Sequence, residues 1–127
     1  MSTLVVESIS NGSGDDINVS DISNKIEGAT AWCRFDILGP ATILQSYNVS
    51  SLIDINTGRW NVQFTVPMVD DEYVALGSAS AGTNTSTDTW INPYSFTVNG
   101  CSFGIYNSAS THVDRSIVCV AFFGSRP

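Results

Sequence analysis

Apolar and polar side chains alternate on both sides of a glycine-containing turn in the segment from residue 49 to residue 66. The turn is Asn56-Thr57-Gly58, and it separates two series of alternate positions. These positions are Val49, Ser51, Ile53 and Ile55 before the turn, and Trp60, Val62, Phe64 and Val66 after it. Because successive side chains of a strand point to opposite faces, this pattern predicts a β-hairpin with one buried face.

Most of the remaining chain consists of similar short apolar segments separated by Gly, Pro and Asn. The strands expected from them cover residues 31–37, 42–47, 72–78, 90–98, 101–106 and 113–123. The dipeptide Asn99-Gly100 predicts a two-residue hairpin turn, because both residues tolerate a positive φ. Segment 113–123 is expected to be the longest strand and, being apolar on both faces, a central one. These features predict an all-β fold, an antiparallel β-sandwich with jelly-roll-like connectivity.

The composition sets limits on the class of protein. A chain of 127 residues is expected to form one domain, and 43% hydrophobic against 13% charged residues is the balance of a folded chain. Twelve acidic residues against five basic ones give a net charge of −7. Because nucleic-acid binding needs clustered Lys and Arg, we expect no nucleic-acid partner. No apolar run is long enough for a membrane span, so no membrane insertion is expected either.

The first 28 residues differ from the rest of the chain. They contain short apolar stretches and a Gly-rich loop, which are too few to form a core of their own. We therefore expect an extended N-terminal arm over residues 1–28, acting in attachment or trimerisation, and a β-sandwich domain over residues 29–127. The apolar arm residues expected to take part in assembly are Leu4, Val5, Val6, Ile9 and Ile17. The first ten residues do not resemble a signal peptide, so synthesis in a cytoplasm is expected.

The segment from Ala31 to Gly77 has a distinctive order of residues. It contains an Ala-aromatic strand (AWCRFD), the run NVSS, a Gly turn into an aromatic strand, and then Met, an acidic pair and YVA. This order resembles a small module of bacteriophage virion proteins. This module occurs at the ends of tail fibres and in short virion proteins, especially of marine and cyanobacterial phages. The resemblance extends over roughly residues 1–80 and implies a homotrimer on the virion surface, made in the cytoplasm of the host bacterium. The sequence departs from the module at Cys33 and Arg34, and beyond Gly82 it does not resemble the module closely.

Residues that could support catalysis are few. His112 is the single histidine, so an imidazole base with Asp114 and one of many serines would have to use it. No serine lies in a Gly-x-Ser-x-Gly turn, and we interpret His112 as a surface residue. The run Asp70-Asp71-Glu72 is interpreted as a solvated turn, with a cation ligand or a glycan-hydrolysing carboxylate pair as alternatives.

The three cysteines are widely spaced. Cys33, Cys101 and Cys119 each lie in an expected strand, and this spacing favours buried free thiols over a zinc site, which uses close Cys pairs. We therefore expect no catalytic residue, no metal and no cofactor.

Aromatic and amide residues beyond residue 82 are candidates for contact with a sugar, because aromatic rings stack on sugar rings and amides bond to hydroxyl groups. The candidate receptor- or glycan-facing residues are Trp90, Asn92, Tyr94, Tyr106 and His112. For Trp90 and Tyr94, packing within a trimer or capping of the sandwich is the preferred interpretation, and sugar stacking is the alternative. The loops expected to face the host cover residues 81–94 and 107–115.

Together these features predict a bacteriophage virion structural protein, a homotrimeric, tail-fibre-like surface appendage for host adsorption. It would act by assembly and binding without catalysis, its arm attached to another virion protein and its outer loops facing host surface glycan. The first alternative is a capsid-decoration protein or head-fibre knob on the outer shell. The second is a carbohydrate-binding or glycan-degrading domain that acts alone.

Overall fold

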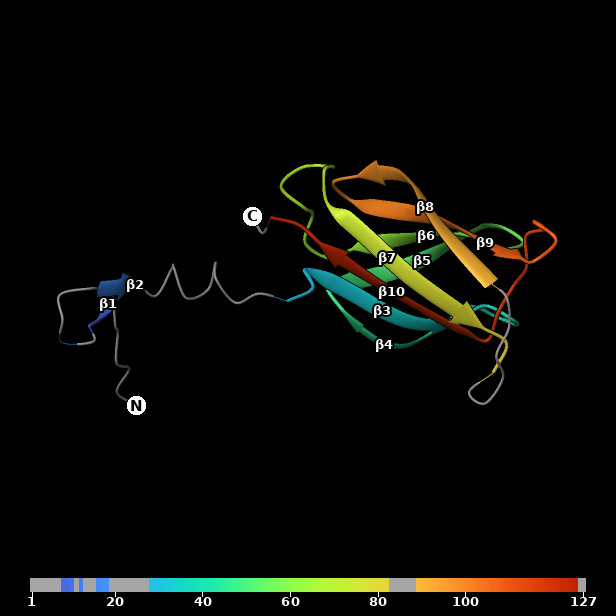
Figure 1. The fold of residues 1–127 in the computed structure, drawn as a ribbon, viewed down its shortest axis with the longest axis horizontal. Helices are drawn as coiled ribbons and strands as arrows, with labels where there is room; N and C mark the ends of the chain where they lie inside the picture. The colour runs from blue at the N-terminus through green and yellow to red at the C-terminus, as the bar shows by residue number, and fades with distance from the viewer. Residues whose placement is uncertain (1–7, 11, 13–15, 19–27, 83–88, 126–127) are drawn as a thin grey trace.

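A computed structural model describes residues 8–10, 12, 16–18, 28–82 and 89–125 of the chain (Figure 1). All regular structure in these residues is β-strand, arranged in two four-stranded antiparallel sheets and one two-stranded pair. The strands are β1 (Ser8–Ser10), β2 (Asp16–Asn18), β3 (Ala31–Asp36), β4 (Thr42–Tyr47), β5 (Val49–Asn56), β6 (Arg59–Phe64), β7 (Val74–Ser80), β8 (Thr89–Thr97), β9 (Gly100–Asn107) and β10 (Ile117–Phe123). The expected all-β class is therefore confirmed.

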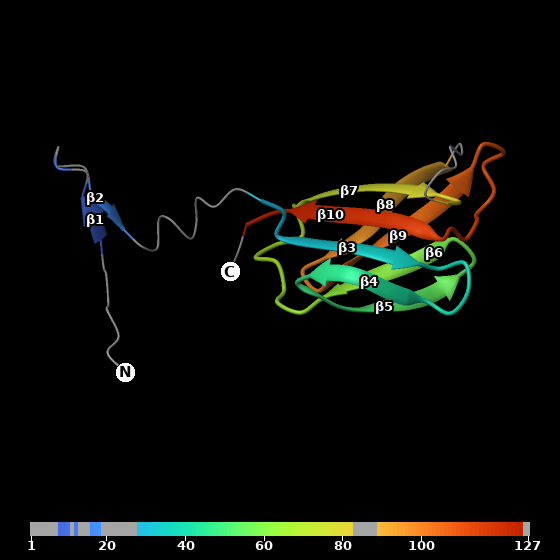
Figure 2. The same ribbon diagram turned by 90° about the horizontal axis from the view of Figure 1, so that it is seen from below.

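The two larger sheets lie in two layers. The first sheet has the strand order β4-β3-β10-β7 and the second has the order β5-β6-β9-β8. Figures 1 and 2 show β3, β7 and β10 crossing over β5, β6 and β9. The hairpins β3–β4, β5–β6 and β8–β9 each stay within one sheet, whereas the other connections pass from one sheet to the other.

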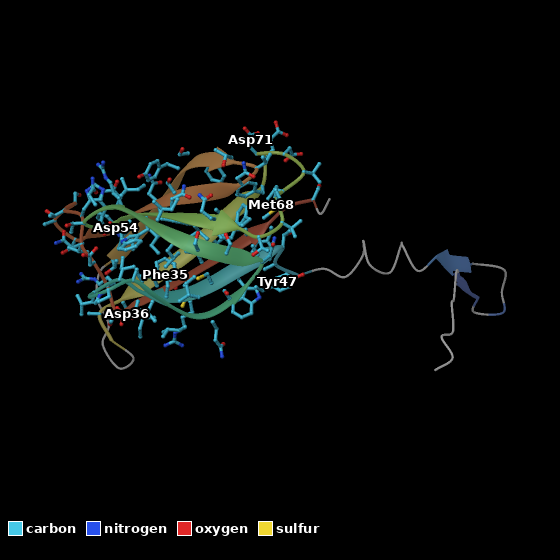
Figure 3. The ribbon with its side chains drawn as sticks, turned by 180° about the vertical axis from the view of Figure 1, so that it is seen from behind. Phe35, Asp36, Tyr47, Asp54, Met68 and Asp71 are labelled. Atoms are coloured by element: carbon cyan, nitrogen blue, oxygen red, sulfur yellow. The ribbon has the colours of Figure 1, made fainter. Side chains whose placement is uncertain are left out.

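One hydrophobic core lies between the two sheets. Both sheets contribute fully buried side chains to it, among them Phe35 and Phe122 from the first sheet and Phe103 from the second. The Phe122 ring packs edge-to-face against Phe64, with 4.9 Å between ring centroids, and against Phe103 at 5.7 Å. Since burying one such side chain contributes about 1.5–3 kcal/mol, these contacts across the layers are a main source of stability. Figure 3 shows Phe35 inside the molecule and Asp71 on its outside.

The alternation in the sequence correctly identified several inward-facing residues. In β3, Ala31, Cys33 and Phe35 are buried, as expected for one face of a half-buried strand. In β6, Trp60, Val62 and Phe64 are also buried. β10 lies between β3 and β7, so its expected central position is confirmed.

Three expected apolar core positions are wrong. β6 ends at Phe64, and Val66 beyond it is 49% exposed. Ile53 and Ile55 of β5 are exposed as well. The register of β5 against β6 shifts between Val49 and Ser51 and again near Asn56, and each shift changes the face on which the following residues lie. Leu52, rather than Ile53, consequently packs against the core.

The expected turn at Asn99-Gly100 is displaced by one residue. The turn residues are Val98 and Asn99, and Gly100 is the first residue of β9, paired with Thr97. Neither Asn99 nor Gly100 has a positive φ. A Cβ atom at Gly100 would collide with the backbone carbonyl of Val62, so glycine is needed here for close approach of the two strands.

Two further expectations about strand lengths are corrected. The last strand begins at Ile117 rather than Val113 and has seven residues, whereas β8 has nine, more than any other described strand. The reason is that Val113 still packs beside β9, where its N–H donates to the Ile105 carbonyl at 3.0 Å. The chain reaches the first sheet only at Arg115, whose carbonyl accepts the Ile37 N–H at 3.0 Å.

The expected N-terminal arm falls only partly within the described residues. β1 and β2 form an antiparallel pair in which Ile9 lies opposite Ile17. Leu4, Val5 and Val6 lie outside the described residues.

Candidate functional site

The register of β8 against β9 brings four of the candidate residues onto one outer face. Trp90 lies opposite Tyr106, and Asn92 lies opposite Gly104. Directly opposed residues of an antiparallel pair share a face, and Tyr94 is placed on the same face by its pairing with Ser102. Trp90 is 56% exposed, so it does not cap the core.

The fifth candidate, His112, joins this face through the turn after β9. An isolated bridge pairs His112 with Tyr106, and their rings stack with 4.2 Å between centroids and 42° between planes. The turn itself is held by Asn107, whose side-chain Oδ1 accepts the backbone N–H groups of Ala109 and Thr111, each at 3.0 Å. His112 therefore occupies a position set by local hydrogen bonds.

Gly104 makes room for the Tyr106 ring. A Cβ atom at residue 104 would lie 2.9 Å from both Cε2 and the hydroxyl oxygen of Tyr106. The ring thus leans back along β9 and covers the position where a side chain of Gly104 would be. The Tyr106 hydroxyl therefore lies over Gly104, between the strands that carry Asn92 and Arg59.

Arg59 belongs to the same face, although the sequence alone did not identify it. It lies opposite Gly104 on the neighbouring strand β6, and its Nε donates a hydrogen bond to Nε2 of His112 at 3.0 Å. For this bond Nε2 must be the unprotonated ring nitrogen. A usable signal was present: Arg59 directly follows the turn glycine and is in phase with the outward residues Asn61 and Gln63.

The polar residues beside Arg59 form a connected row. Asn61 Nδ2 donates to the Ser102 hydroxyl at 2.8 Å, and Gln63 Nε2 donates to Asn61 Oδ1. Ser102 is only 4% exposed although it is on the outward side of β9, where the Asn61 side chain bonds to its hydroxyl group. We refer to six residues of this face as the aromatic–basic surface: the exposed Arg59, Trp90 and Asn92, and the partly exposed Tyr94, Tyr106 and His112.

The other catalytic and metal candidates lie elsewhere or have other partners. Asp114 Oδ1 accepts the Gly58 N–H at 2.8 Å, while His112 bonds to Arg59, so the described hydrogen bonds do not join His112 to Asp114. Asp70 Oδ1 accepts the Glu72 N–H at 3.0 Å within an exposed turn, and Figure 3 shows Asp71 well away from Asp54. Within the described ranges, no three His, Cys, Asp or Glu side chains gather as a possible metal site.

The three cysteines are free thiols. Cys33 and Cys101 are buried in the core, and burial raises the pKa of Cys33 to about 12 and that of Cys101 to about 11. Cys119 lies on the other face of β10 and is partly exposed. Because a raised pKa keeps a thiol protonated at neutral pH, the two buried cysteines are poor nucleophiles.

The first sheet has a different outer face. Its strands align four side chains in one row, Tyr47, Trp32, Ala121 and Leu76, each opposite the next on neighbouring strands. Phe123 and Val74 form a second pair beside this row. Except for the partly buried Ala121, all of these side chains are exposed, and we refer to the six residues as the apolar surface. Figure 3 shows Tyr47 on the outside of the molecule.

Comparison with family models, with curated proteins and with solved structures found no match for this chain. The described residues also contain no helix that is long and apolar enough to cross a membrane. The geometry of the two outer faces is therefore the basis on which a function can be proposed.

Proposed function

We propose that this chain is a structural and binding protein of a bacteriophage virion, and that its aromatic–basic surface binds a glycan of the host cell without catalysis. The observation that carries the binding proposal is the strand register, which assembles Trp90, Asn92, Tyr94, Tyr106 and His112 on one outward face. The virion setting rests on the resemblance of the segment from Ala31 to Gly77 to phage virion modules.

A surface of this kind suits a sugar. A pyranose ring presents an apolar face that stacks on exposed aromatic rings, and hydroxyl groups that bond to amide and hydroxyl side chains. Trp90 supplies an exposed ring, while Asn92 and Tyr94 supply polar groups two and four residues further along β8. Because β8 and β9 are paired strands of one sheet, these groups are held in place before a ligand arrives, which lowers the entropy cost of binding.

Glycan binding can be tested with the purified protein on an array of bacterial surface oligosaccharides, followed by calorimetric titration of the best ligand. Trp90→Ala is expected to weaken binding about ten-fold or more, since a stacked aromatic contributes about 1–3 kcal/mol. The matched control is Leu38→Ala, which removes an exposed apolar side chain that belongs to neither the aromatic–basic surface nor the apolar surface. Equal losses in the two variants, or no binding by the parent protein, would contradict the proposal.

Self-assembly is the second part of the proposal, with a homotrimer as the expected state. The apolar surface supports it, because a row of exposed apolar side chains across four strands is stabilised when a second copy covers it. Light scattering on the eluting protein should give the trimer mass. Leu76→Asp should shift it to monomer, whereas Ile55→Asp on the other sheet should not. A monomeric parent protein would rule out the trimer.

The finer architecture is also proposed: a β-sandwich with jelly-roll-like connectivity and an N-terminal arm that attaches to another virion protein. Eight strands divided equally between two sheets, with a shared core, support the sandwich. Electron cryomicroscopy of the virion would locate the subunit. Density on the tail supports the tail-fibre assignment, and density on the shell alone replaces it with capsid decoration.

A further inference from the structure

The outer face of the second sheet has an unusual charge for this chain. The protein carries a net charge of −7, yet the residues that share this face on β6, β8 and β9 include no carboxylate. Their only charged member is Arg59. The face is therefore a local site for a negative group on an otherwise acidic protein.

The carboxylates next to Arg59 in the fold are directed elsewhere. Asp54 pairs with Trp60 and so lies on the opposite side of the strand from Arg59. The Asp114 carboxylate accepts the Gly58 N–H, as described above. Among the described residues, no carboxylate forms an ion pair with Arg59, and the described hydrogen bond of its side chain runs from Nε to His112.

The bond to His112 leaves the terminal nitrogens of Arg59 available while it fixes the guanidinium group. Those two nitrogens form a planar fork that fits the paired oxygens of a carboxylate or phosphate. His112 is in turn held by stacking on Tyr106, and Tyr106 pairs with the exposed Trp90. Arg115 does not add to this charge, because its Nε donates at 3.2 Å to the hydroxyl of Thr89, which alternates with Trp90 along β8 and so lies on the other side of the strand.

We propose that the aromatic–basic surface recognises a saccharide that carries an acidic group, with Arg59 binding the carboxylate or phosphate and Trp90 stacking on the sugar ring. This inference rests on the proposed glycan-binding function and specifies its ligand. A dense polyanion such as a nucleic acid fits poorly, because its remaining charges would be repelled by the net negative charge of the protein. One acidic group beside neutral sugars matches a single fixed cation among aromatic and amide side chains.

The test uses the full chain and three synthetic trisaccharides that differ at one position. The first ends in glucuronic acid, the second is its carboxyl-reduced, neutral counterpart, and the third ends in glucose 6-phosphate. The parent protein is expected to bind at least one acidic probe about 10- to 100-fold more tightly than the neutral one. Added salt should weaken only the binding of the acidic probe. The acidic probe that binds more tightly shows whether the surface prefers a carboxylate or a phosphate.

Three variants separate the roles of the residues. Arg59→Gln should reduce affinity for the acidic probe to that for the neutral one, and Arg59→Lys should retain part of the preference because it keeps the charge without the fork. Arg34→Gln, which removes an arginine from the outer face of the other sheet, should change nothing. Trp90→Ala should weaken binding of all three probes.

The outcomes distinguish this inference from the proposed function. If the neutral probe binds as tightly as the acidic ones and Trp90→Ala weakens both, the glycan-binding function stands and the acidic specificity is overturned. If Arg59→Gln behaves like Arg34→Gln, Arg59 is not the anion-binding residue and the inference fails. If no saccharide binds at all, or single-stranded nucleic acid binds instead, both proposals fail. Circular dichroism of each variant checks that the fold is retained.

Discussion

Tyr73 joins the two sheets at one end of the core, and its hydroxyl group is the basis of a specific prediction. The residue precedes β7 of the first sheet and is only 6% exposed. Its hydroxyl oxygen lies 2.9 Å from the Thr97 carbonyl and 2.8 Å from the Gly100 carbonyl, the two residues that flank the β8–β9 turn of the second sheet. The substitution Tyr73→Phe keeps the ring and removes only this link.

The expected loss of stability depends on which hydrogen-bond donors remain for the Thr97 and Gly100 carbonyls after the substitution. The Gly100 carbonyl still accepts a hydrogen bond from the Thr97 hydroxyl at 3.1 Å, so it keeps a partner. The Thr97 carbonyl loses the Tyr73 hydroxyl, its only described side-chain donor. A lost hydrogen bond costs about 0.5–1.5 kcal/mol, and a buried carbonyl that loses a side-chain donor adds to this. We therefore expect Tyr73→Phe to lower the free energy of unfolding by about 2 kcal/mol.

Urea unfolding followed by tryptophan fluorescence measures this difference. With a slope of about 2 kcal/mol per M, the midpoint should fall by about 1 M and the slope should not change. Tyr47→Phe is the matched control, since Tyr47 is exposed on the apolar surface, and its effect should stay within about 0.5 kcal/mol. If both variants unfold at the same urea concentration, the Tyr73 hydroxyl does not link the sheets.

Three other outcomes are expected from the same kind of measurement. Burial raises the pKa of Cys33 to about 12 and that of Cys101 to about 11, from an ordinary value of 9.0. Above pH 9.0 the unfolded chain therefore releases these thiol protons while the folded chain keeps them, and the free energy of unfolding should fall as the pH rises. Cys101→Ala should make this fall shallower, and an unchanged pH profile would contradict the prediction. Gly58→Ala should cost about 2–4 kcal/mol, because residue 58 has φ 67° and a Cβ there would lie 2.7 Å from a backbone nitrogen. Gly39→Ala, where a Cβ meets nothing within 4 Å, is its control and should change the midpoint little. Asn48→Ala should lower the free energy of unfolding by about 2–3 kcal/mol. The Asn48 side chain makes three hydrogen bonds to the backbone, one to Thr30 at 3.3 Å and two to Val66 at 3.1 and 2.7 Å. A loss below about 0.5 kcal/mol, measured by thermal unfolding, would refute this.

The sequence pattern predicted the strands better than it predicted the faces they present. In β3 and β6 the alternation is unbroken, and the inward positions Cys33, Phe35 and Val62 could be identified from it. In β5 the same reasoning failed at Ile53, because one extra residue in the strand exchanges the two faces from that point on. The bulge lies in the Ser50–Ser51 region, where neither residue identity marks it, and it depends on how β5 fits against β6.

The candidate site could be predicted as a set of residues but not as an arrangement. Aromatic and amide residues at 90, 92, 94 and 106 were identifiable by type, and their common face follows once β8 and β9 are in register. The alternation of apolar and polar residues does not show which side chains contact one another across neighbouring strands. Tyr106 leans over Gly104 because that position has no side chain, His112 stacks on the leaning ring, and Arg59 from β6 bonds to His112. Gly104→Ala is therefore informative: it should displace the Tyr106 ring and, through His112, the guanidinium group of Arg59. If affinity for an acidic sugar falls in this variant while the stability stays near that of the parent, the fixed position of Arg59, and not only its charge, contributes to binding.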